Sequence, residues 1–475
     1  MKTEQSNRFS VDPAELQRQS EYSDMVRTVL SARFAPDRPK AFVHTYGCQG
    51  NVSDGEKIKG ILCDLGFALT DDLQQADLVL YNTCAIREHA QDRVFGNVGK
   101  LKPIKEQKRS MLIALCGCMM QQDYVAEKIK KSYPYVDLVF GTHVIYKLPE
   151  FLYRCLCSGK RVFDLSGGDG NIVEGLPVHR DGSFKAWIPI MYGCNNFCSY
   201  CVVPLVRGRE RSRSFEAVVK EARDLVNAGY KELTLLGQNV NSYNKDLDPS
   251  LRFPALLRAI NDIPGDFIIR FMTSHPRDCS KELLQAMADC EKVAKHLHLP
   301  FQSGNDRVLR EMNRHYDSAK YLSLIDQAYR LMPELSVTSD VIVGFPGETA
   351  DEFEDTLSIV RRVRFTSLFT FIFSPRPGTK AATLEDPTPR EEKNRRFKAL
   401  TDLQESIAAQ RTAAMRGKTY RVLVEEPGRE EGFLSGRTEG NVIIEFPADA
   451  SLIGTFQYVT VTEPKTWILK GELNP

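Results

Sequence analysis

The sequence predicts an α/β protein of three parts: an open parallel α/β domain, a central partial (βα)6 barrel and a small C-terminal all-β barrel. The first two parts are predicted because apolar runs of strand length alternate with amphipathic helical segments in two successive series. The third is predicted because, after Gly417, short apolar runs follow one another between Gly and Pro turns without helical patterns. The 475 residues leave room for about three domains.

The composition is that of an ordinary globular protein. Lys and Arg number 63 and Asp and Glu 62, so a net charge of +1 excludes a strongly basic nucleic-acid coat over the whole chain. No apolar run is long enough to span a bilayer, and the first twenty residues lack the apolar segment of a secretory signal. We therefore expect a cytoplasmic protein without a membrane partner.

The N-terminal part begins after a polar extension, residues 1–38, for which we expect partial disorder and a weak helix between Leu16 and Leu30. Four apolar runs then alternate with helical segments in residues 39–157, and a Gly-rich linker around Gly167–Gly170 follows. The predicted strands are Ala41–Tyr46, Leu78–Asn82, Met111–Leu115 and Leu138–Phe140.

The central domain is predicted over residues 180–410 and the C-terminal barrel over 413–475. Six strand–helix units are too few for an eight-unit barrel, and a charged helix, Pro389–Arg411, closes the domain. Its predicted strands are Trp187–Tyr192, Leu233–Leu236, Phe267–Met272, His296–Leu299, Ser336–Val343 and Leu368–Phe373. The C-terminal runs are Tyr420–Val424, Phe433–Thr438, Val442–Phe446 and Tyr458–Leu469.

One group of the twelve cysteines is tightly clustered. Cys194, Cys198 and Cys201 are spaced C-x3-C-x2-C, directly after the first predicted strand of the central domain. In a reducing compartment such clusters indicate metal or redox chemistry rather than disulfides. Three thiolates can bind three irons of a 4Fe-4S cluster and leave the fourth iron open to a small molecule. The alternative is a zinc site, which usually needs a fourth protein ligand.

A second group of cysteines is dispersed in sequence. Cys48, Cys84 and Cys118 each follow a predicted strand of the N-terminal domain. The carboxyl ends of parallel strands line one crevice, so the three thiols could converge there. The alternative is three separate buried thiols that pack as small hydrophobic groups.

The cysteine motif at the start of a partial barrel resembles the radical SAM superfamily. The resemblance implies that the open iron binds S-adenosylmethionine, which one electron cleaves to a 5′-deoxyadenosyl radical. It also implies S-adenosylmethionine contacts at strand ends and beside the last cysteine, where the alternative is ordinary turn residues. These candidates are Tyr200, Gly237, Gln238, Asn239, Asp340 and Gly344.

The segments His44–Asn51, Asn82–Glu88 and Gly117-Cys118 resemble the N-terminal domain of the methylthiotransferases. The resemblance implies an auxiliary 4Fe-4S cluster on Cys48, Cys84 and Cys118, with Cys118 favoured over Cys116. The Asn82–Glu88 segment and Arg207–Arg213 are similar to the MiaB group, and the C-terminal barrel resembles the TRAM domain, an RNA-binding module.

This resemblance implies methylthiolation at C2 of N6-isopentenyl(dimethylallyl)adenosine-37 in tRNA, with two S-adenosylmethionine molecules consumed. The implied partners are the tRNA anticodon stem-loop, S-adenosylmethionine, a reductant and a sulfur donor, and we expect a monomer. One alternative is a methylthiotransferase of threonylcarbamoyl-adenosine tRNA or of a ribosomal-protein aspartate. Another is an iron–sulfur RNA-binding or electron-transfer protein without radical chemistry.

The arginine run after the central cysteines is the candidate RNA contact, because guanidinium groups neutralise and fork onto phosphates. The alternative is a solvated basic loop with Glu210 as its internal partner. The run consists of Arg207, Arg209, Arg211 and Arg213. The C-terminal barrel has more acidic than basic residues, so a local patch such as Arg416, Lys418 and Arg437 must bind RNA there.

Overall fold

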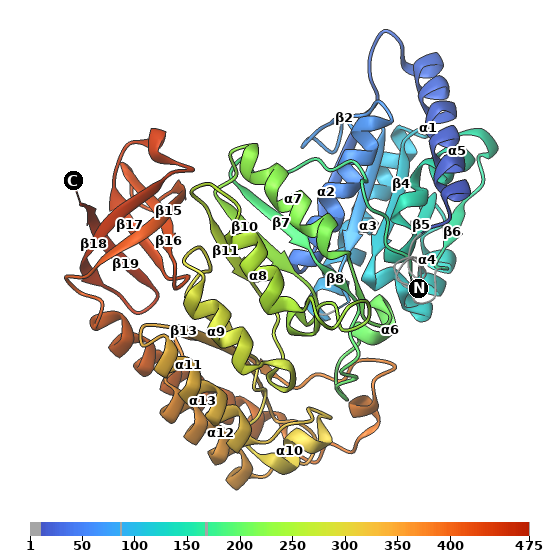
Figure 1. Cartoon of the computed structure of the whole chain (residues 1–475). Helices are drawn as coiled ribbons and strands as arrows, with labels where there is room; N and C mark the ends of the chain where they lie inside the picture. The colour runs from blue at the N-terminus through green and yellow to red at the C-terminus, as the bar shows by residue number, and fades with distance from the viewer. Residues whose placement is uncertain (1–10, 86–87, 167–169, 475) are drawn as a thin grey trace. The chain divides into compact units, whose positions relative to one another are not determined.

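The structure is a computed structural model that describes residues 11–85, 88–166 and 170–474 (Figure 1). The chain forms two compact units. The first comprises Met1–Asp181, Met191–Asn195 and Val202–Ser214, and the second Gly182–Ile190, Asn196–Cys201 and Phe215–Pro475. Ile86 and Arg87 of the Asn82–Glu88 motif, and Gly167–Asp169 of the expected linker, lie outside the described residues. None of the described helices combines the length and the apolar character needed to cross a membrane.

A six-stranded, all-parallel sheet forms the centre of the first unit, with the strand order β2-β1-β3-β4-β5-β6. The expected strands are confirmed, whereas β2 and β6 are too short to give a sequence pattern. Because β6 pairs with β5, the sheet extends beyond the expected boundary at residue 157. The strands are β1 (Lys40–Thr45), β2 (Ala68–Leu69), β3 (Leu78–Thr83), β4 (Leu112–Gly117), β5 (Leu138–Phe140) and β6 (Val162–Asp164).

Helices cover both faces of this sheet. Apolar residues of α2 (Gln49–Asp64) and α5 (Leu148–Ser158) pack on one face, and those of α3 (Glu88–Gln107) and α4 (Asp123–Ser132) on the other. The N-terminal extension departs from expectation, because α1 (Pro13–Phe34) is a continuous helix that packs on α5. Asp12 caps it, and Val26 and Leu30 are buried in the core beneath it.

The second unit contains the predicted partial barrel. Six parallel strands form two sheets, β11-β10-β7 and β12-β13-β14, and an isolated parallel bridge joins Ile269 of β11 to Val293, just before β12. The strands are β7 (Lys185–Pro189), β10 (Glu232–Leu236), β11 (Ile268–Phe271), β12 (His296–His298), β13 (Ser336–Val343) and β14 (Ser367–Ile372). The helices are α7 (Phe215–Asn227), α8 (Phe253–Asn261), α9 (Lys281–Asp289), α10 (Asp306–Glu311), α11 (Ser318–Leu331), α12 (Ala350–Val363) and α13 (Arg390–Ala413).

The C-terminal strands form a closed barrel in the order β15-β16-β17-β19-β18 (Figure 1). Its core consists of inward-facing Val, Leu, Ile and Phe side chains. The predicted run Tyr458–Leu469 is two strands, because a turn at Lys465–Trp467 separates them. The strands are β15 (Thr419–Pro427), β16 (Phe433–Thr438), β17 (Ile443–Pro447), β18 (Phe456–Pro464) and β19 (Ile468–Leu473).

Candidate functional site

The dispersed cysteines follow three neighbouring strands of the first sheet. Cys48 follows β1, Cys84 follows β3 and Cys118 follows β4, where it begins a short 3-10 helix. The chain runs outward from β1 to β2 and then returns to β3 on the other side of β1. Ligands of doubly wound sheets bind at such a reversal of strand order, outside the carboxyl ends of the strands. The topology therefore brings together the three cysteines that the sequence predicted.

Close backbone approaches hold these cysteines together. The Cys84 thiol is within hydrogen-bonding reach of both Cys48 and Cys118. Gly47 has a positive φ of 108°, and a Cβ there would lie 2.3 Å from the Cys84 Cβ. Gly117 has φ 99°, and its Cβ would lie 2.2 Å from the Thr83 carbonyl oxygen. A side chain at either glycine would push the strand ends apart, so the Gly-Cys pairs have a steric cause.

Cys118 and its neighbour Cys116 have different environments. Hydrogen bonding by Cys84 lowers the pKa of Cys118 despite its burial, and the Ala85 N–H donates to its Sγ over 3.2 Å. Burial raises the pKa of Cys116, which belongs to the apolar core beneath the sheet. Cys118 therefore packs with Cys84 at the strand ends, whereas Cys116 faces the core on the other side of the backbone.

Three polar residues lie beside these cysteines: Asn51 and Asp54 were not identified from the sequence, and Arg207 was predicted only as an RNA contact. Arg207 is 6% exposed, and its guanidinium pairs with Asp54 (2.7 Å) and donates to Asn51 Oδ1 (2.8 Å). The Cys48 and Cys118 Sγ atoms lie 3.7 and 3.8 Å from the same Asn51 oxygen. Burial lowers the pKa of Arg207, but the charges of Asp54, Cys118 and Cys48 outweigh it and raise the pKa.

The clustered cysteines divide between the two units. Cys194 lies in the first unit, where it follows β8 (Met191–Tyr192) and its N–H donates to the Gly208 carbonyl over 3.1 Å. Cys198 and Cys201 lie in the second unit, where the Cys201 N–H donates to the Cys198 carbonyl over 3.0 Å. No described set of three His, Cys, Asp or Glu side chains has the arrangement needed to hold a single metal ion.

Tyr200 lies between an apolar cluster and a buried arginine. Its ring packs against Phe345, Phe373 and neighbouring apolar side chains. Arg314, 4% exposed, donates to the Tyr200 hydroxyl (3.4 Å) and approaches the Cys198 Sγ (3.5 Å). Sequence reasoning missed Arg314 because it belongs to no recognised motif.

Unpaired polar atoms gather after β10 and β11. Asn239 is completely buried and donates to Asp278 over 2.7 Å, but its Oδ1 has no hydrogen-bond partner among the described residues. The Oε1 of Gln238, the Oγ of Ser274 and the Nε2 of His275 also lack described partners. The loops touch, because the Val240 N–H donates to the Thr273 carbonyl over 3.1 Å. Burial of unpaired polar atoms is costly, so these two loops are a candidate site for a polar ligand. Gly237, also a candidate, begins the first of these loops.

The remaining candidates lie on or just after β13. Asp340 faces His298, with 3.6 Å between Oδ1 and Nε2. Gly344 follows the strand with φ 69°, and its N–H donates to Glu348 over 2.8 Å.

The arginine run differs from the expected phosphate surface. Arg207, Arg211 and Arg213 are buried, and only Arg209 of the four is exposed. Arg211 donates to the carbonyls of Arg207 and Arg209, and Arg213 pairs with Glu174 over 2.5 Å. Phosphate binding needs accessible guanidinium groups, so we correct the prediction for the three buried arginines and keep it for Arg209.

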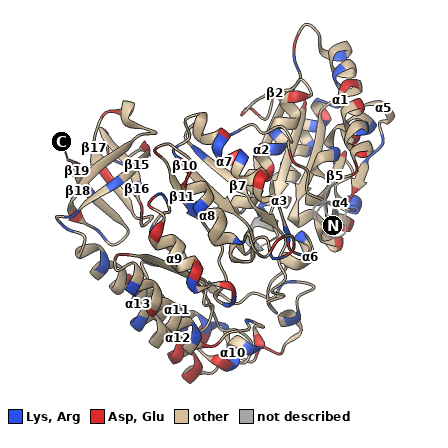
Figure 2. Cartoon of the chain, viewed as in Figure 1, with Lys and Arg blue, Asp and Glu red and all other residues tan. Residues whose placement is uncertain are grey.

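The basic residues expected to form a patch on the C-terminal barrel have acidic neighbours, and Figure 2 shows residues of both charges on the barrel strands. Lys418 pairs with Glu334 (2.7 Å), and Arg437 with Glu425 (3.3 Å). Two aromatic side chains of the barrel are more than half exposed, Tyr458 at 57% and Trp467 at 51%.

Three sequence families match successive parts of the chain. Residues 40–141 match the uncharacterized protein family UPF0004, residues 188–360 the radical SAM superfamily, and residues 413–473 the TRAM domain. A tRNA-2-methylthio-N(6)-dimethylallyladenosine synthase of Acetivibrio thermocellus is 47% identical over 98% of this chain and 97% of its own length. A synthase of the same name from Thermoanaerobacter sp. is 49% identical over 91% of this chain and 92% of its own length.

The chain belongs to the MiaB group of radical SAM methylthiotransferases. Solved structures agree with this chain in fold. The radical S-adenosylmethionine methyltransferase TsrM from Kitasatospora setae is 15% identical, with a TM-score of 0.53 over 84% of this chain and 78% of its own. At that identity the likeness concerns the fold alone. The predicted α/β fold with a partial barrel and a C-terminal TRAM barrel is thus confirmed.

Proposed function

We propose that this chain methylthiolates C2 of N6-isopentenyladenosine-37 in tRNA and consumes two S-adenosylmethionine molecules. The observation that carries the proposal is the 47% identity to a named synthase over nearly the whole length of both chains. Both cysteine sets lie within the matched length, one in the UPF0004 match and the other in the radical SAM match.

The reaction needs a radical because an aromatic C–H bond offers no acidic proton and no leaving group. Cys194, Cys198 and Cys201 would hold the 4Fe-4S cluster that reduces S-adenosylmethionine, and the bound pair supplies the hydrogen-abstracting radical. The other three cysteines would hold the auxiliary cluster, to which we assign the inserted sulfur. The converging thiols and the close approach of the Gly47 backbone to Cys84 suit such a group.

The chain's own residues bind and orient S-adenosylmethionine. The unpaired oxygens of Gln238 and Asn239 would accept hydrogen bonds from its amine, and the Tyr200 ring would lie beside its adenine. Asp340 and Gly344 would border the nucleoside from β13. The buried Arg314 holds Tyr200 through its hydroxyl, and so fixes the ring before the ligand arrives.

Two half-exposed aromatic residues suit the nucleobase with its apolar substituent. Phe369 and Phe371, 49% and 48% exposed, are register partners of Asp340 and Ile342, so they share one face of the sheet with them. Burial of an isopentenyl group against such rings makes the free energy of binding about 2–4 kcal/mol more favourable, at ~0.8 kcal/mol per CH₂. That corresponds to a preference of roughly 30-fold or more over unmodified tRNA.

The net charge of the chain is only +1, so its overall charge does not attract RNA strongly. Local contacts must therefore bind the RNA. We assign stacking of splayed bases to Tyr458 and Trp467 on the C-terminal barrel, and a phosphate contact to Arg209. A reductant and a sulfur donor are the remaining partners that the reaction requires.

The test is anaerobic incubation of reconstituted protein with isopentenylated tRNA, unmodified tRNA or a ribosomal-protein substrate. We expect a methylthio mass increment on isopentenylated tRNA. An increment on the protein, or equal turnover of unmodified tRNA, would refute the substrate assignment.

A paired substitution sharpens this test. In the double variant Phe369→Ala/Phe371→Ala, the ratio of affinities for isopentenylated and unmodified tRNA should fall about tenfold. The variant should still cleave S-adenosylmethionine. Leu384→Ala, an apolar side chain that is also exposed, serves as the control and should leave the preference unchanged.

A further inference from the structure

The carboxamide of Asn51 has a fixed orientation beside the dispersed cysteines. Asn51 is fully buried, and its Nδ2 donates to the carbonyls of Tyr46 (3.1 Å) and Thr83 (2.7 Å). Both amide hydrogens are thus used, so Oδ1 must point the other way. There it lies 3.7 Å from the Cys48 Sγ and 3.8 Å from the Cys118 Sγ.

This arrangement creates an electrostatic problem when the cysteines are ligands. A thiol can donate to Asn51 Oδ1, but a thiolate has no hydrogen to donate, so two anionic sulfurs would face an acceptor oxygen. The Asp54 carboxylate, 4% exposed, adds a further negative charge nearby. A cation is needed to keep this geometry.

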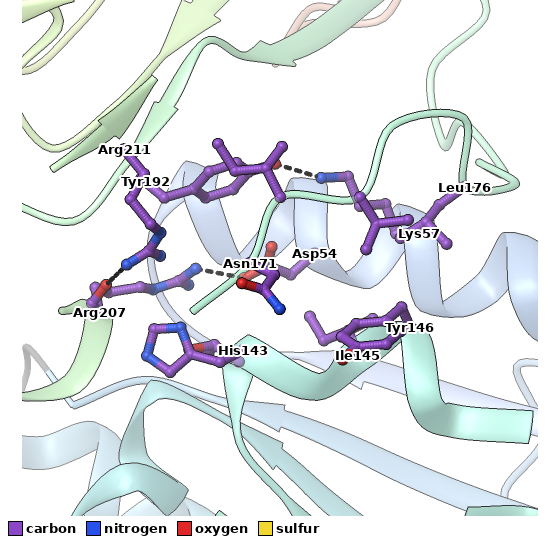
Figure 3. Close-up of a pocket in the computed structure, with 13 residues that line it drawn as sticks. Asp54, Lys57, His143, Ile145, Tyr146, Asn171, Leu176, Tyr192, Arg207 and Arg211 are labelled. Carbon is purple, nitrogen blue, oxygen red and sulfur yellow. Dashed lines mark hydrogen bonds and ion pairs between the residues drawn. The ribbon is translucent and has the colours of Figure 1, made fainter. Parts of the chain in front are cut away.

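Arg207 provides that cation. Figure 3 shows its guanidinium extended toward Asp54 at one side of a pocket in the first unit. One nitrogen pairs with Asp54 (2.7 Å) and another donates to Asn51 Oδ1 (2.8 Å), so the fork holds both partners in fixed positions. Val206, the preceding residue of α6 (Val203–Arg207), packs with Cys84 and Cys118, which places this short helix directly over the thiols.

We propose that Arg207 is a positioning residue of the auxiliary site: it fixes the Asn51 carboxamide against Cys48 and Cys118, and its charge raises the reduction potential of the cluster they hold. The inference rests on the proposed binding of a 4Fe-4S cluster by Cys48, Cys84 and Cys118. It assigns to a residue of the arginine run a role in cluster chemistry rather than in RNA binding.

The test isolates the auxiliary cluster in the full-length chain. Cys194, Cys198 and Cys201 are replaced by Ala, and this parent is reconstituted with iron and sulfide under anaerobic conditions. Into it we introduce Arg207→Gln alone, because replacing Asp54 as well would remove an opposite charge from the same place and cancel the effect on the potential. Arg207→Lys retains the charge without the fork, and Arg209→Gln, two residues on and exposed, is the matched control.

Iron content and an electron paramagnetic resonance titration of the reduction potential are measured. The Arg207→Gln variant should bind the parent's iron but lower the reduction equilibrium constant at least tenfold, which is 59 mV for one electron. Arg207→Lys should stay within about threefold of the parent because the charge remains. Arg209→Gln should match the parent.

Each other outcome has a defined meaning. An unchanged potential in Arg207→Gln, or an equal shift in Arg209→Gln, would overturn the role of Arg207. Loss of iron with an unaltered unfolding midpoint would support positioning, whereas loss of iron with a lowered midpoint would assign a merely structural role and overturn it. A parent that binds no iron would instead refute the proposed cysteine ligands, and the inference with them.

Discussion

The two cysteine sets of this chain are assembled by opposite means. Cys194, Cys198 and Cys201 lie within eight consecutive residues, whereas Cys48, Cys84 and Cys118 follow three separate strands and meet only because β1, β3 and β4 are neighbours. The first set therefore depends on local sequence and the second on the packing of a whole sheet. Disturbances of the fold should affect the second set before the first.

The largest effects should come from removing either set completely. We expect about eight irons per chain after anaerobic reconstitution, and about four after Cys48, Cys84 and Cys118 are replaced by Ala. That triple variant should still cleave S-adenosylmethionine. The Cys194/Cys198/Cys201 triple should also keep about four irons but lose cleavage, because the open iron that binds S-adenosylmethionine is gone. Iron analysis and an assay for 5′-deoxyadenosine give both results, and eight irons in either variant would contradict the ligand assignment.

Substitution of Gly47 tests the dependence on packing. Gly47→Ala must overcome a positive φ and a 2.3 Å contact with Cys84, so we expect a loss of about 2–5 kcal/mol in the free energy of unfolding. Iron loss should be confined to the auxiliary site. Gly66→Ala, with φ 103° but nothing within 4 Å, is the control and should cost only about 1–2 kcal/mol. Equal losses in urea titrations of the two variants would show that the contact with Cys84 is unimportant.

In the second unit, Glu348 should make stability depend on pH. Burial raises its pKa to about 7. The folded chain then binds a proton more tightly than the unfolded chain between about pH 4.5 and 7, so stability should fall by up to about 3 kcal/mol as the pH rises through this window. Glu348→Gln should flatten this slope in urea titrations. Glu352 is a control with the opposite pH dependence, because the Arg307 hydrogen bond lowers its pKa to about 2. Its contribution to the free energy of unfolding is lost only as the pH falls below about 4.5. If the free energy of unfolding of Glu348→Gln and of the unaltered chain changed with pH in the same way, the prediction would be refuted.

The smallest effect concerns the arginine run. Arg209→Ala should weaken binding of all tRNAs a few-fold, since it removes one phosphate contact. The slope of the logarithm of the binding constant against the logarithm of the salt concentration (the salt slope) should fall by about 1. Arg213→Ala should instead lower the free energy of unfolding and leave the salt slope unchanged, because Arg213 is buried against Glu174. Filter binding across a salt series distinguishes the two, and identical slopes for both variants would count against the phosphate contact.

The same contrast explains what could be predicted from the sequence. The strands before Cys48, Cys84 and Cys118 were found because each is an apolar run with a turn after it, whereas the predicted strand Trp187–Tyr192 is two strands, β7 and β8, in different sheets. The burial of Arg207 and Arg213 was missed because their partners, Asp54 and Glu174, come from distant segments and leave no local pattern. Helix α1 was underestimated for the same reason, since the core that buries Val26 and Leu30 is supplied by other parts of the first unit.

The closed C-terminal barrel has a consequence for the timing of folding. Strand β19 (Ile468–Leu473) lies between β17 and β18, so it completes a ring whose other members all precede it in the chain. During synthesis these earlier strands must wait, with one ladder of hydrogen bonds unmade, until residues 468–473 leave the ribosome. The partial barrel before it has no such final strand and can begin to pack as each strand–helix unit emerges. A purified chain truncated after residue 467 should therefore keep a protease-resistant central domain, whereas residues 419–467, which lack the closing strand, should be digested.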